Sequence, residues 1–565
     1  MVNLKKYLSN HLWILIVPLS FFAIRALLVP GFYGASDDLH IAWLFELDRL
    51  VKLGQFPPRF VPDLSYSFGY PLFNFVFPLP FYLAEVFHLI GFSLVDSIKA
   101  VFLLSVPLSG VLMYQFLKTF TSKSLSLAGA IMYMYSPYRS TDIYIRGAIG
   151  EIVAFIFLPL AALSITNLFA RSNDSKQFIN LRWIGIGAFA FAGLVLTHNI
   201  AAYMFMPLLF ILAVAKLISI KNYLRNLLNL FAAFFLGLMI SLYFWLPAIQ
   251  DSSLMKYDTV FNFVDHFPTI KQLIVPYWGY GASVAGPNDG MSFFLGMPTL
   301  FIIVIGIFLI GLAWKRFSGD QKVVVGWAIA SLLIALIMMN FRSILIWQKV
   351  PLIPFFQFPW RFLIITTFAA PILVIAFDKL RYRNFVALVI LILVLITNFS
   401  SFHPQDYLGR GDSYYLNKYI PLSIASEEYS KTQEEYLRLP LGTVQRPDKI
   451  YPRVFPQTGQ IIQVKELDSL TALIDTNSNE KFTLNYNKYY FPGWYATIDN
   501  QDADISAGAP FGQIQVAVPS GSHVIKIGFA ETKQKIFLDI ISVVGIIIAV
   551  LCCINPDMIK KWKTT

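Results

Sequence analysis

GASDDLH (residues 34–40) stands a few residues beyond the first long apolar run of the chain, residues 12–30. Two adjacent carboxylates are unusual so close to a segment of membrane-spanning length. With Ser36 as N-cap, Asp37 and Asp38 fall in the first turn of an amphipathic helix, where the helix dipole favours ionised carboxylates. The pair is a candidate general base, and the alternative is an ordinary acidic first turn of an interfacial helix.

The composition of the whole chain indicates a protein of the lipid bilayer. Its 565 residues are 56% hydrophobic, 16% aromatic and 14% charged, and apolar runs of spanning length recur along it. The net charge of +11 does not indicate nucleic acid as a partner, since the basic residues form short clusters between apolar runs, as cytoplasmic loops do. The only cysteines, Cys552 and Cys553, are adjacent, so no disulfide framework is expected.

The number of membrane crossings is predicted from the apolar segments and from the basic residues at both chain ends. Cytoplasmic termini require an even number of crossings, and segment 73–91 is the one interrupted by prolines, Glu85 and His88. If segment 73–91 is not counted as a crossing, every basic cluster falls on the same side of the membrane as the two termini. The thirteen segments lie at about 12–30, 73–91, 97–117, 124–138, 149–170, 182–198, 200–219, 226–247, 294–313, 322–340, 361–379, 384–399 and 536–554. The sequence thus predicts a polytopic α-helical protein of the plasma membrane with about 12 spans and both termini cytoplasmic.

Three parts are expected along the chain. Residues 1–399 form a multi-span membrane domain whose external loop 31–96 carries interfacial helices, residues 400–535 form an external β-rich domain, and residues 536–565 form a final span with a basic cytoplasmic tail. Alternating apolar residues predict strands at Lys481–Tyr489, Trp494–Ile498, Ile514–Val518 and Val524–Phe529. The turn residues 519–522 predict a hairpin between the last two strands, and a small β-sandwich is expected.

A second concentration of charge lies in residues 136–151. Glu151 falls at the mouth of a span, where an ionisable residue indicates a functional site. Arg146 or Arg139 is its expected partner, and an ion pair that only fixes the helix end is the alternative.

Arginines at the external ends of spans are candidates for phosphate recognition. Arg361 follows an aromatic stretch at the start of a span, and Arg59 lies in the first external loop. A guanidinium group suits phosphate because it presents several donors at fixed geometry, whereas interfacial snorkelling is the alternative. His198 lies at a turn between spans, either lining a cavity or serving as a structural helix-end residue.

Several catalytic signatures are absent from the sequence. It contains no Walker A motif, no G-x-G-x-x-G, no H-E-x-x-H, no G-x-S-x-G and no clustered Cys/His ligand set. These absences argue against ATP-driven transport, zinc hydrolysis and serine hydrolysis.

Two sets of short motifs lie along the chain. The first set comprises Asp37-Asp38-x-His40, Pro57-Pro58-Arg59-Phe60 with Pro62-Asp63-Leu64, Gly69-Tyr70-Pro71-Leu72-Phe73, Ser136-Pro137-Tyr138 and Arg146-Gly147-Ala148-Ile149-Gly150-Glu151. The second set, near the end of the chain, comprises Tyr490-Phe491-Pro492-Gly493-Trp494 and Val516-Ala517-Val518-Pro519-Ser520-Gly521-Ser522-His523. The first set resembles the bacterial membrane domain named "6-pyruvoyl-tetrahydropterin synthase-related", without implying pterin chemistry, and the second is similar to the external C-terminal region of YfhO-type membrane proteins.

Both families resemble the wider GT-C class of membrane glycosyltransferases, which carry an acidic residue in the first external loop and use sugars linked to polyprenyl phosphate. The resemblance implies a catalytic base at Asp37 or Asp38. The positions expected to bind substrate are His40, Arg59, Arg146, Glu151, His198 and Arg361. The acidic-x-acidic motif of metal-dependent relatives is missing, which argues against a divalent metal, and no other cofactor is implied.

The expected activity is transfer of a sugar from a polyprenyl-phosphate donor to a cell-envelope polymer or glycolipid on the external face of the membrane. The expected partners are that lipid-linked sugar, the acceptor and the bilayer. A lipid or polymer transporter and a non-catalytic scaffold for envelope assembly are the alternatives. Buried charges near the membrane midplane favour transport, whereas charges gathered at one external face favour transfer.

Overall fold

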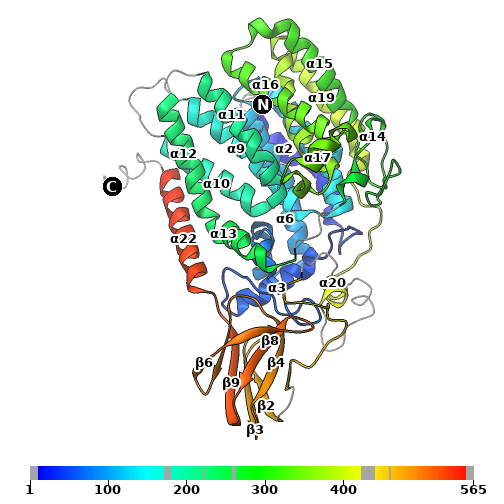
Figure 1. The fold of residues 1–565 in the computed structure, drawn as a ribbon. Helices are drawn as coiled ribbons and strands as arrows, with labels where there is room; N and C mark the ends of the chain where they lie inside the picture. The colour runs from blue at the N-terminus through cyan, green and yellow to red at the C-terminus, as the bar shows by residue number, and fades with distance from the viewer. Residues whose placement is uncertain are drawn as a thin grey trace.

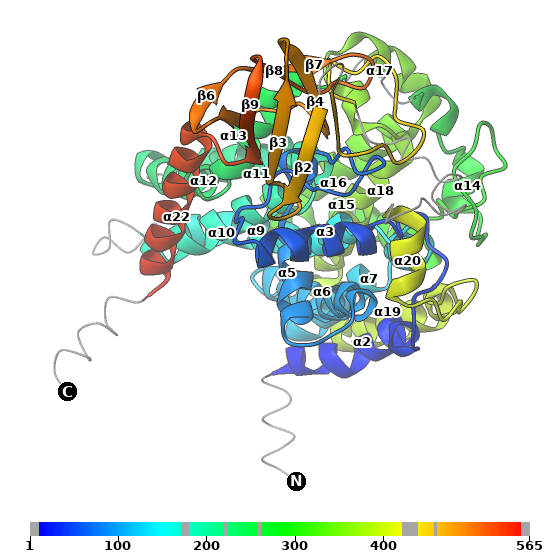
Figure 2. The same cartoon turned by 90° about the horizontal axis from the view of Figure 1, so that it is seen from below.

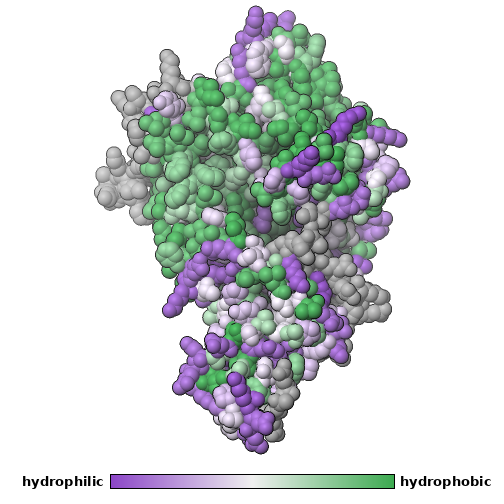
Figure 3. Space-filling model, viewed as in Figure 1, coloured by the Kyte–Doolittle hydropathy of each residue, from purple (hydrophilic) through white to green (hydrophobic). Residues whose placement is uncertain are grey.

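The computed structural model describes residues 11–170, 180–219, 223–256, 262–420, 439–456 and 460–554. A body of helices fills most of the molecule, and β-strands from the C-terminal part gather at one end (Figure 1). Hydrophobic residues dominate the visible surface of the helical body, whereas hydrophilic ones surround the strands (Figure 3). The chain is therefore a polytopic helical membrane protein with a β-rich C-terminal region.

Nine helical segments among the described residues are long and apolar enough to cross a membrane. They are helical because every backbone polar group in hydrocarbon must be paired within its own segment. They comprise α6 (Leu94–Leu117), α9 (Ile149–Ala170), α11 (Asn199–Ile218), α12 (Tyr223–Ile240), α15 (Met297–Ala313) with its extension to Arg316, α16 (Gly319–Met339), the stretch Pro359–Lys379 that contains α18 (Leu363–Ala369), α19 (Arg383–Asn398) with its extension to Ser401, and α22 (Lys533–Cys553).

The remaining predicted spans correspond to shorter helices. They are α2 (Ile16–Ile24) within the apolar stretch Leu12–Leu28, α7 (Lys123–Met134) and α10 (Leu181–Thr197). Segment 73–91 contains α5 (Leu79–Leu89), whose length of about 16 Å at ~1.5 Å per residue is well below the ~30 Å of a bilayer core. The count of twelve crossings and the orientation stay predictions.

The helix after the acidic pair begins later than the sequence predicts. Helix α3 spans His40–Lys52 and has no side-chain cap, so Ser36 is not its N-cap and the two aspartates precede its first turn. The cause is tertiary: the backbone N–H groups of Ser36 and Asp37 donate to the carbonyls of Ile145 (3.0 Å) and Arg146 (2.7 Å). The acidic turn is thereby fixed to the second charged segment.

Shorter helices connect the spans and cover the ends of the body. Seen from the side of the strands, α3 lies across the helical body with α20 beside it (Figure 2). The connecting helices are α4 (Leu72–Phe75), α8 (Pro137–Thr141), α13 (Leu242–Asp251), α14 (Ile270–Ile274), α17 (Ile344–Lys349) and α20 (Asp412–Tyr419).

The β-region consists of two sheets. One has the order β1-β4-β8-β7 and the other β2-β3-β9-β5-β6, and the rings of Tyr486 and Trp494, 5.8 Å apart, join one sheet to the other. The strands are β1 (Val454–Pro456), β2 (Gln460–Glu466), β3 (Ala472–Ser478), β4 (Phe482–Tyr489), β5 (Trp494–Ile498), β6 (Gln501–Ala503), β7 (Ile505–Gly508), β8 (Gln513–Val518) and β9 (Gly521–Phe529).

The predicted hairpin at residues 519–522 is wrong. Strand β8 pairs with β4 and β7, whereas β9 pairs with β3 and β5. The turn therefore carries the chain from one sheet to the other, because each strand buries its apolar side chains between the two sheets.

The first external loop predicted from the sequence holds the β-region in place. Phe60 packs against Trp494 and Phe529, with ring centroids 5.3 Å from each. The buried ammonium group of Lys488 donates to the carbonyls of Pro62 (2.6 Å) and Ser67 (2.8 Å). Burial lowers the pKa of this lysine well below its ordinary value, because it removes water from the charged form. The two carbonyls replace part of the lost hydration.

Candidate functional site

The second charged segment has an unusual backbone. After α8, a π-helical turn spans Asp142–Arg146 and ends at Gly147, which has a positive φ of 69°. π-turns are often found at functional sites, and a left-handed residue at a helix end is most easily glycine. This turn places Arg146 beside the first turn of α9, where Glu151 lies.

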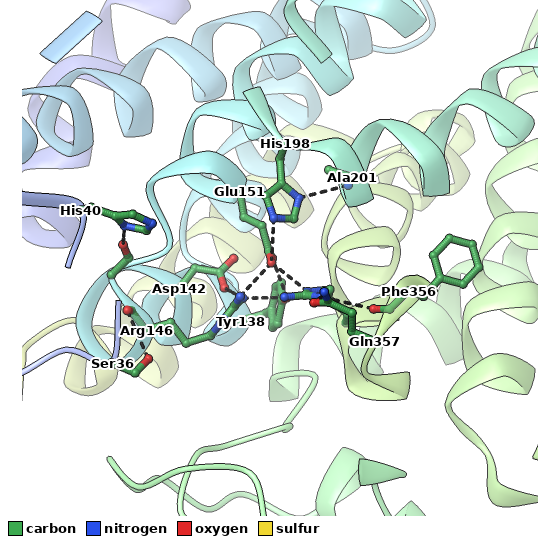
Figure 4. Close-up of polar contacts among 12 residues, drawn as sticks. Ser36, His40, Tyr138, Asp142, Arg146, Glu151, His198, Ala201, Phe356 and Gln357 are labelled. Carbon is green, nitrogen blue, oxygen red and sulfur yellow. Dashed lines mark hydrogen bonds and ion pairs between the residues drawn. The ribbon is translucent and has the colours of Figure 1, made fainter. Parts of the chain in front are cut away.

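Glu151 is the centre of a buried charged cluster (Figure 4). It is fully buried. Its Oε1 accepts hydrogen bonds from Arg146 Nη2 at 2.9 Å and Arg361 Nε at 3.1 Å, and its Oε2 accepts one from the Tyr138 hydroxyl at 2.7 Å. One carboxylate therefore fixes two guanidinium groups from distant parts of the chain.

Arg146 has a second carboxylate partner. Its Nη1 donates to Asp142 Oδ1 at 2.5 Å, and its guanidinium carbon lies 5.1 Å from the centre of the Trp360 ring. Burial and the neighbouring Glu151 raise the pKa of Asp142 well above its ordinary value, against the opposing effect of Arg146. Glu151 is thus the principal countercharge of the two arginines, and the cluster favours a further anion.

Both histidines predicted for the site lie at this cluster. His198 Nδ1 accepts the N–H of Ala201 at 3.1 Å, so its proton is on Nε2, which lies 3.8 Å from Glu151 Oε1. His40 Nδ1 lies 3.3 Å from the carbonyl of Gly147 and donates to it. Burial lowers the pKa of His40, so its imidazole is neutral at neutral pH.

The two adjacent aspartates have different environments. Asp38 is 4% exposed; its Oδ2 pairs with Lys418 Nζ at 2.9 Å, and the Tyr419 hydroxyl donates to its Oδ1. Asp37 is half-buried, and its carboxylate accepts no hydrogen bond and forms no ion pair among the described residues. The sequence left the choice between them open, and these contacts favour Asp37 as the available base.

Arg59 contacts a different group of residues. It is 3% exposed, and its guanidinium donates to Glu531 Oε1 (2.6 Å), Asp539 Oδ1 (2.9 Å) and the carbonyl of Tyr243 (2.7 Å). These contacts tie the loop to the start of α22. The structure thus brings together Asp37, His40, Arg146, Glu151, His198 and Arg361, and places Arg59 in an ion-pair cluster of its own.

Arg139, the other expected partner of Glu151, also lies elsewhere. Its Nη1 donates to Ser109 Oγ at 2.7 Å, and its guanidinium carbon lies 4.5 Å from the Phe155 ring centre.

The sequence did not identify four residues of the site, which are Tyr138, Asp142, Trp360 and Gln357. The spacing of four residues between Asp142 and Arg146 could have predicted their ion pair, because such residues are neighbours on a helix. Nothing in the sequence around Gln357 predicts its contact with Arg361.

The described residues contain no group of three or more His, Cys, Asp or Glu side chains placed to hold a metal ion. The groups that meet at the Glu151 cluster are two guanidiniums, the Glu151 carboxylate and the carboxyl group of Asp142, whose pKa is raised. This arrangement can bind an anionic oxygen and leave a separate carboxylate, that of Asp37, to accept a proton.

The fold and the site are those of a polytopic helical membrane protein with a β-rich C-terminal region. No protein-family model matches the chain. It is 24% identical over 259 residues to an uncharacterized protein of Lactococcus lactis subsp. cremoris (strain MG1363), a match that covers 44% of this chain and 41% of that protein. The resemblance to the YfhO-type and pterin-synthase-related families stays an expectation from the motifs.

Two solved structures of the mycobacterial arabinofuranosyltransferase AftD show a likeness to the chain. One has a TM-score of 0.44 at 14% identity, over 71% of this chain and 27% of that one. The other, a mutant, has a TM-score of 0.43 at 15% identity, over 72% of this chain and 28% of that one. The chain spans less than half the length of each of these proteins.

Proposed function

We propose that the chain is a GT-C-like membrane glycosyltransferase that moves a sugar from a polyprenyl-phosphate donor to a cell-envelope polymer or glycolipid. The observation that carries the proposal is a half-buried Asp37, unpaired among the described residues, whose backbone N–H donates to the carbonyl of Arg146 at 2.7 Å. This bond joins the backbone of Asp37 to that of Arg146, whose guanidinium shares Glu151 Oε1 with the guanidinium of Arg361. Sugar transfer from a phosphate leaving group requires a proton acceptor and cationic groups at neighbouring positions.

The reaction is a displacement at the anomeric carbon. Asp37 accepts the proton of the acceptor hydroxyl, whose oxygen forms the new bond to the sugar. The bond between the anomeric carbon and the phosphate oxygen breaks, and its electron pair stays on the phosphate. Arg146 and Arg361 stabilise the negative charge that develops there, because guanidinium donors bind phosphate oxygens strongly.

The site and the β-region are proposed to lie on the external side of the membrane, with the loop at Arg381 in the cytoplasm. Ser520 and Arg381 are both exposed, and Cys552 and Cys553, the only cysteines of the chain, can first be replaced by serine. In intact cells, a membrane-impermeant maleimide is expected to label Ser520→Cys and to leave Arg381→Cys unlabelled until the cells are opened. Labelling of both from outside, or of Arg381→Cys alone, contradicts this orientation.

Arg361→Lys is expected to lower sugar transfer about ten- to a hundredfold at matched folded protein. A lysine replaces the planar guanidinium by a point charge, so the contacts to Glu151 and Gln357 cannot both be kept. Loss of one charged hydrogen bond at the phosphate costs about 1.5–3 kcal/mol. The assay is transfer from a polyprenyl-phosphate sugar in liposomes.

Arg59→Lys is the matched control, because Arg59 binds Glu531 and Asp539 rather than the Glu151 cluster. It is expected to lower thermal stability while transfer per folded molecule stays near the wild-type value. Full transfer by Arg361→Lys, or no transfer by the wild-type protein with any donor, contradicts the proposed function and favours a transporter or a scaffold.

A further inference from the structure

Gln357 has a backbone conformation that is costly for any residue except glycine. Its φ is 70° and its ψ is −55°. The N–H of Phe358 donates to the carbonyl of Phe356 at 2.8 Å, which closes a three-residue turn of the rare classic γ type. Such strained conformations persist at functional sites, where the surrounding structure holds them in place. A glutamine, not a glycine, occupies this position, so other contacts must compensate for the strain.

The Gln357 side chain contacts Arg361. Arg361 Nη1 donates to Gln357 Oε1 at 2.5 Å and to the carbonyl of Phe356 at 3.2 Å. The backbone and the side chain of the γ-turn therefore hold the same nitrogen. Figure 4 shows Gln357 and Phe356 on the side of the cluster opposite His40.

The other contacts of Arg361 complete its orientation. Its Nε donates to Glu151 Oε1 at 3.1 Å, and its guanidinium carbon lies 5.3 Å from the Phe358 ring centre and 5.8 Å from the Trp360 ring centre. Its Nη2 donates no hydrogen bond among the described residues. Two nitrogens of the guanidinium are thus used for orientation, and Nη2 is left for a ligand.

We propose that Gln357 is a positioning residue that turns the Nη2 edge of Arg361 toward the phosphate of the lipid-linked donor. The inference rests on the proposed function, since it assumes that Arg361 binds that phosphate. The strained turn brings Oε1 into line with Nη1, and a residue in ordinary conformation at 357 presents its side chain in another direction. The γ-turn and the amide oxygen act together, and neither is sufficient alone.

The test measures binding of farnesyl phosphate and of farnesol, its uncharged counterpart, to the full-length protein in detergent. The wild-type protein is expected to prefer farnesyl phosphate. Gln357→Met keeps the length of the side chain but removes the acceptor, and it is expected to raise the Kd for farnesyl phosphate about tenfold, on the scale of one charged hydrogen bond. The Kd for farnesol is expected to stay unchanged, which a general loss of structure does not produce.

Gln357→Gly separates the backbone from the side chain, because glycine adopts the turn without strain. We expect it to bind farnesyl phosphate as weakly as Gln357→Met while the protein stays folded. Leu352→Gly is the matched control: Leu352 also has a positive φ, of 71°, in the same segment, and its replacement is expected to leave both Kd values unchanged.

Two results overturn the inference, and a third overturns the proposed function beneath it. Wild-type affinity for farnesyl phosphate in Gln357→Met or Gln357→Gly shows that the amide does not position Arg361. Tighter binding in either variant shows that Gln357 competes with the phosphate. If the wild-type protein itself binds farnesyl phosphate no better than farnesol, the donor site is misplaced, and the inference falls with it.

Discussion

Asp37→Asn is expected to reduce sugar transfer by at least about 100-fold, the usual scale for loss of a general base, while binding of the polyprenyl-phosphate donor stays unchanged. Asparagine nearly preserves the shape of the side chain and removes its basicity. The backbone bond from residue 37 to the carbonyl of Arg146 (2.7 Å) does not involve the side chain, so the turn should persist. Transfer and donor binding are measured separately, in liposomes and at matched folded protein.

Asp38→Asn is the comparison variant. Asp38 is held by Lys418 and Tyr419, so its replacement weakens the attachment of α20 to the acidic turn. We expect a loss of about 1–3 kcal/mol in stability, the scale of a charged hydrogen bond, with transfer per folded molecule kept within about tenfold of the wild-type value, well short of the general-base loss expected at Asp37. Near-normal transfer by Asp37→Asn removes the base from this loop, and a larger loss in Asp38→Asn than in Asp37→Asn exchanges the two roles.

Glu151→Gln is expected to destabilise the folded protein by about 3–5 kcal/mol, the cost of breaking a buried ion pair by removal of one partner. Glu151 is fully buried and accepts hydrogen bonds from both Arg146 and Arg361. Neutralising it leaves two buried guanidinium groups whose only remaining acidic neighbour in the cluster is Asp142. The measurement is the thermal unfolding of the purified protein in detergent.

Two further variants separate this effect from a general sensitivity to glutamine. Glu480→Gln changes an exposed glutamate in the turn before β4 and is expected to leave unfolding unchanged. Adding Arg361→Met to Glu151→Gln removes one of the uncompensated charges and is expected to restore part of the lost stability, since a buried pair replaced on both sides costs little. Wild-type unfolding of Glu151→Gln contradicts the assignment of Glu151 as the centre of the cluster.

The class of fold was predictable from the sequence because its causes are local. Hydrocarbon forces an apolar run to pair its own backbone groups, so the predicted segments 97–117 and 149–170 correspond closely to α6 (Leu94–Leu117) and α9 (Ile149–Ala170). Alternating apolar residues likewise predicted β5 at Trp494–Ile498, since a strand with one buried face has a period of two.

The membership of the candidate site was only partly predictable. A charge at the mouth of a span is costly wherever the chain folds, and this general rule singled out Glu151 and Arg361. It applied equally to Arg59 and Arg139, which the structure places in other contacts. Charge and position along the chain identify which residues need a partner, but not which partner each one finds.

Tertiary packing decided those partners. The choice of Asp37 over Asp38 depends on Lys418, which is 380 residues away along the chain, and the start of α3 depends on the carbonyls of Ile145 and Arg146. The strained turn at Gln357 meets Arg361 through the carbonyl of Phe356 and the Gln357 side chain. A short-range pattern specifies a helix or a strand through its own backbone, whereas a hydrogen bond between distant residues forms only after the helices that carry them have packed.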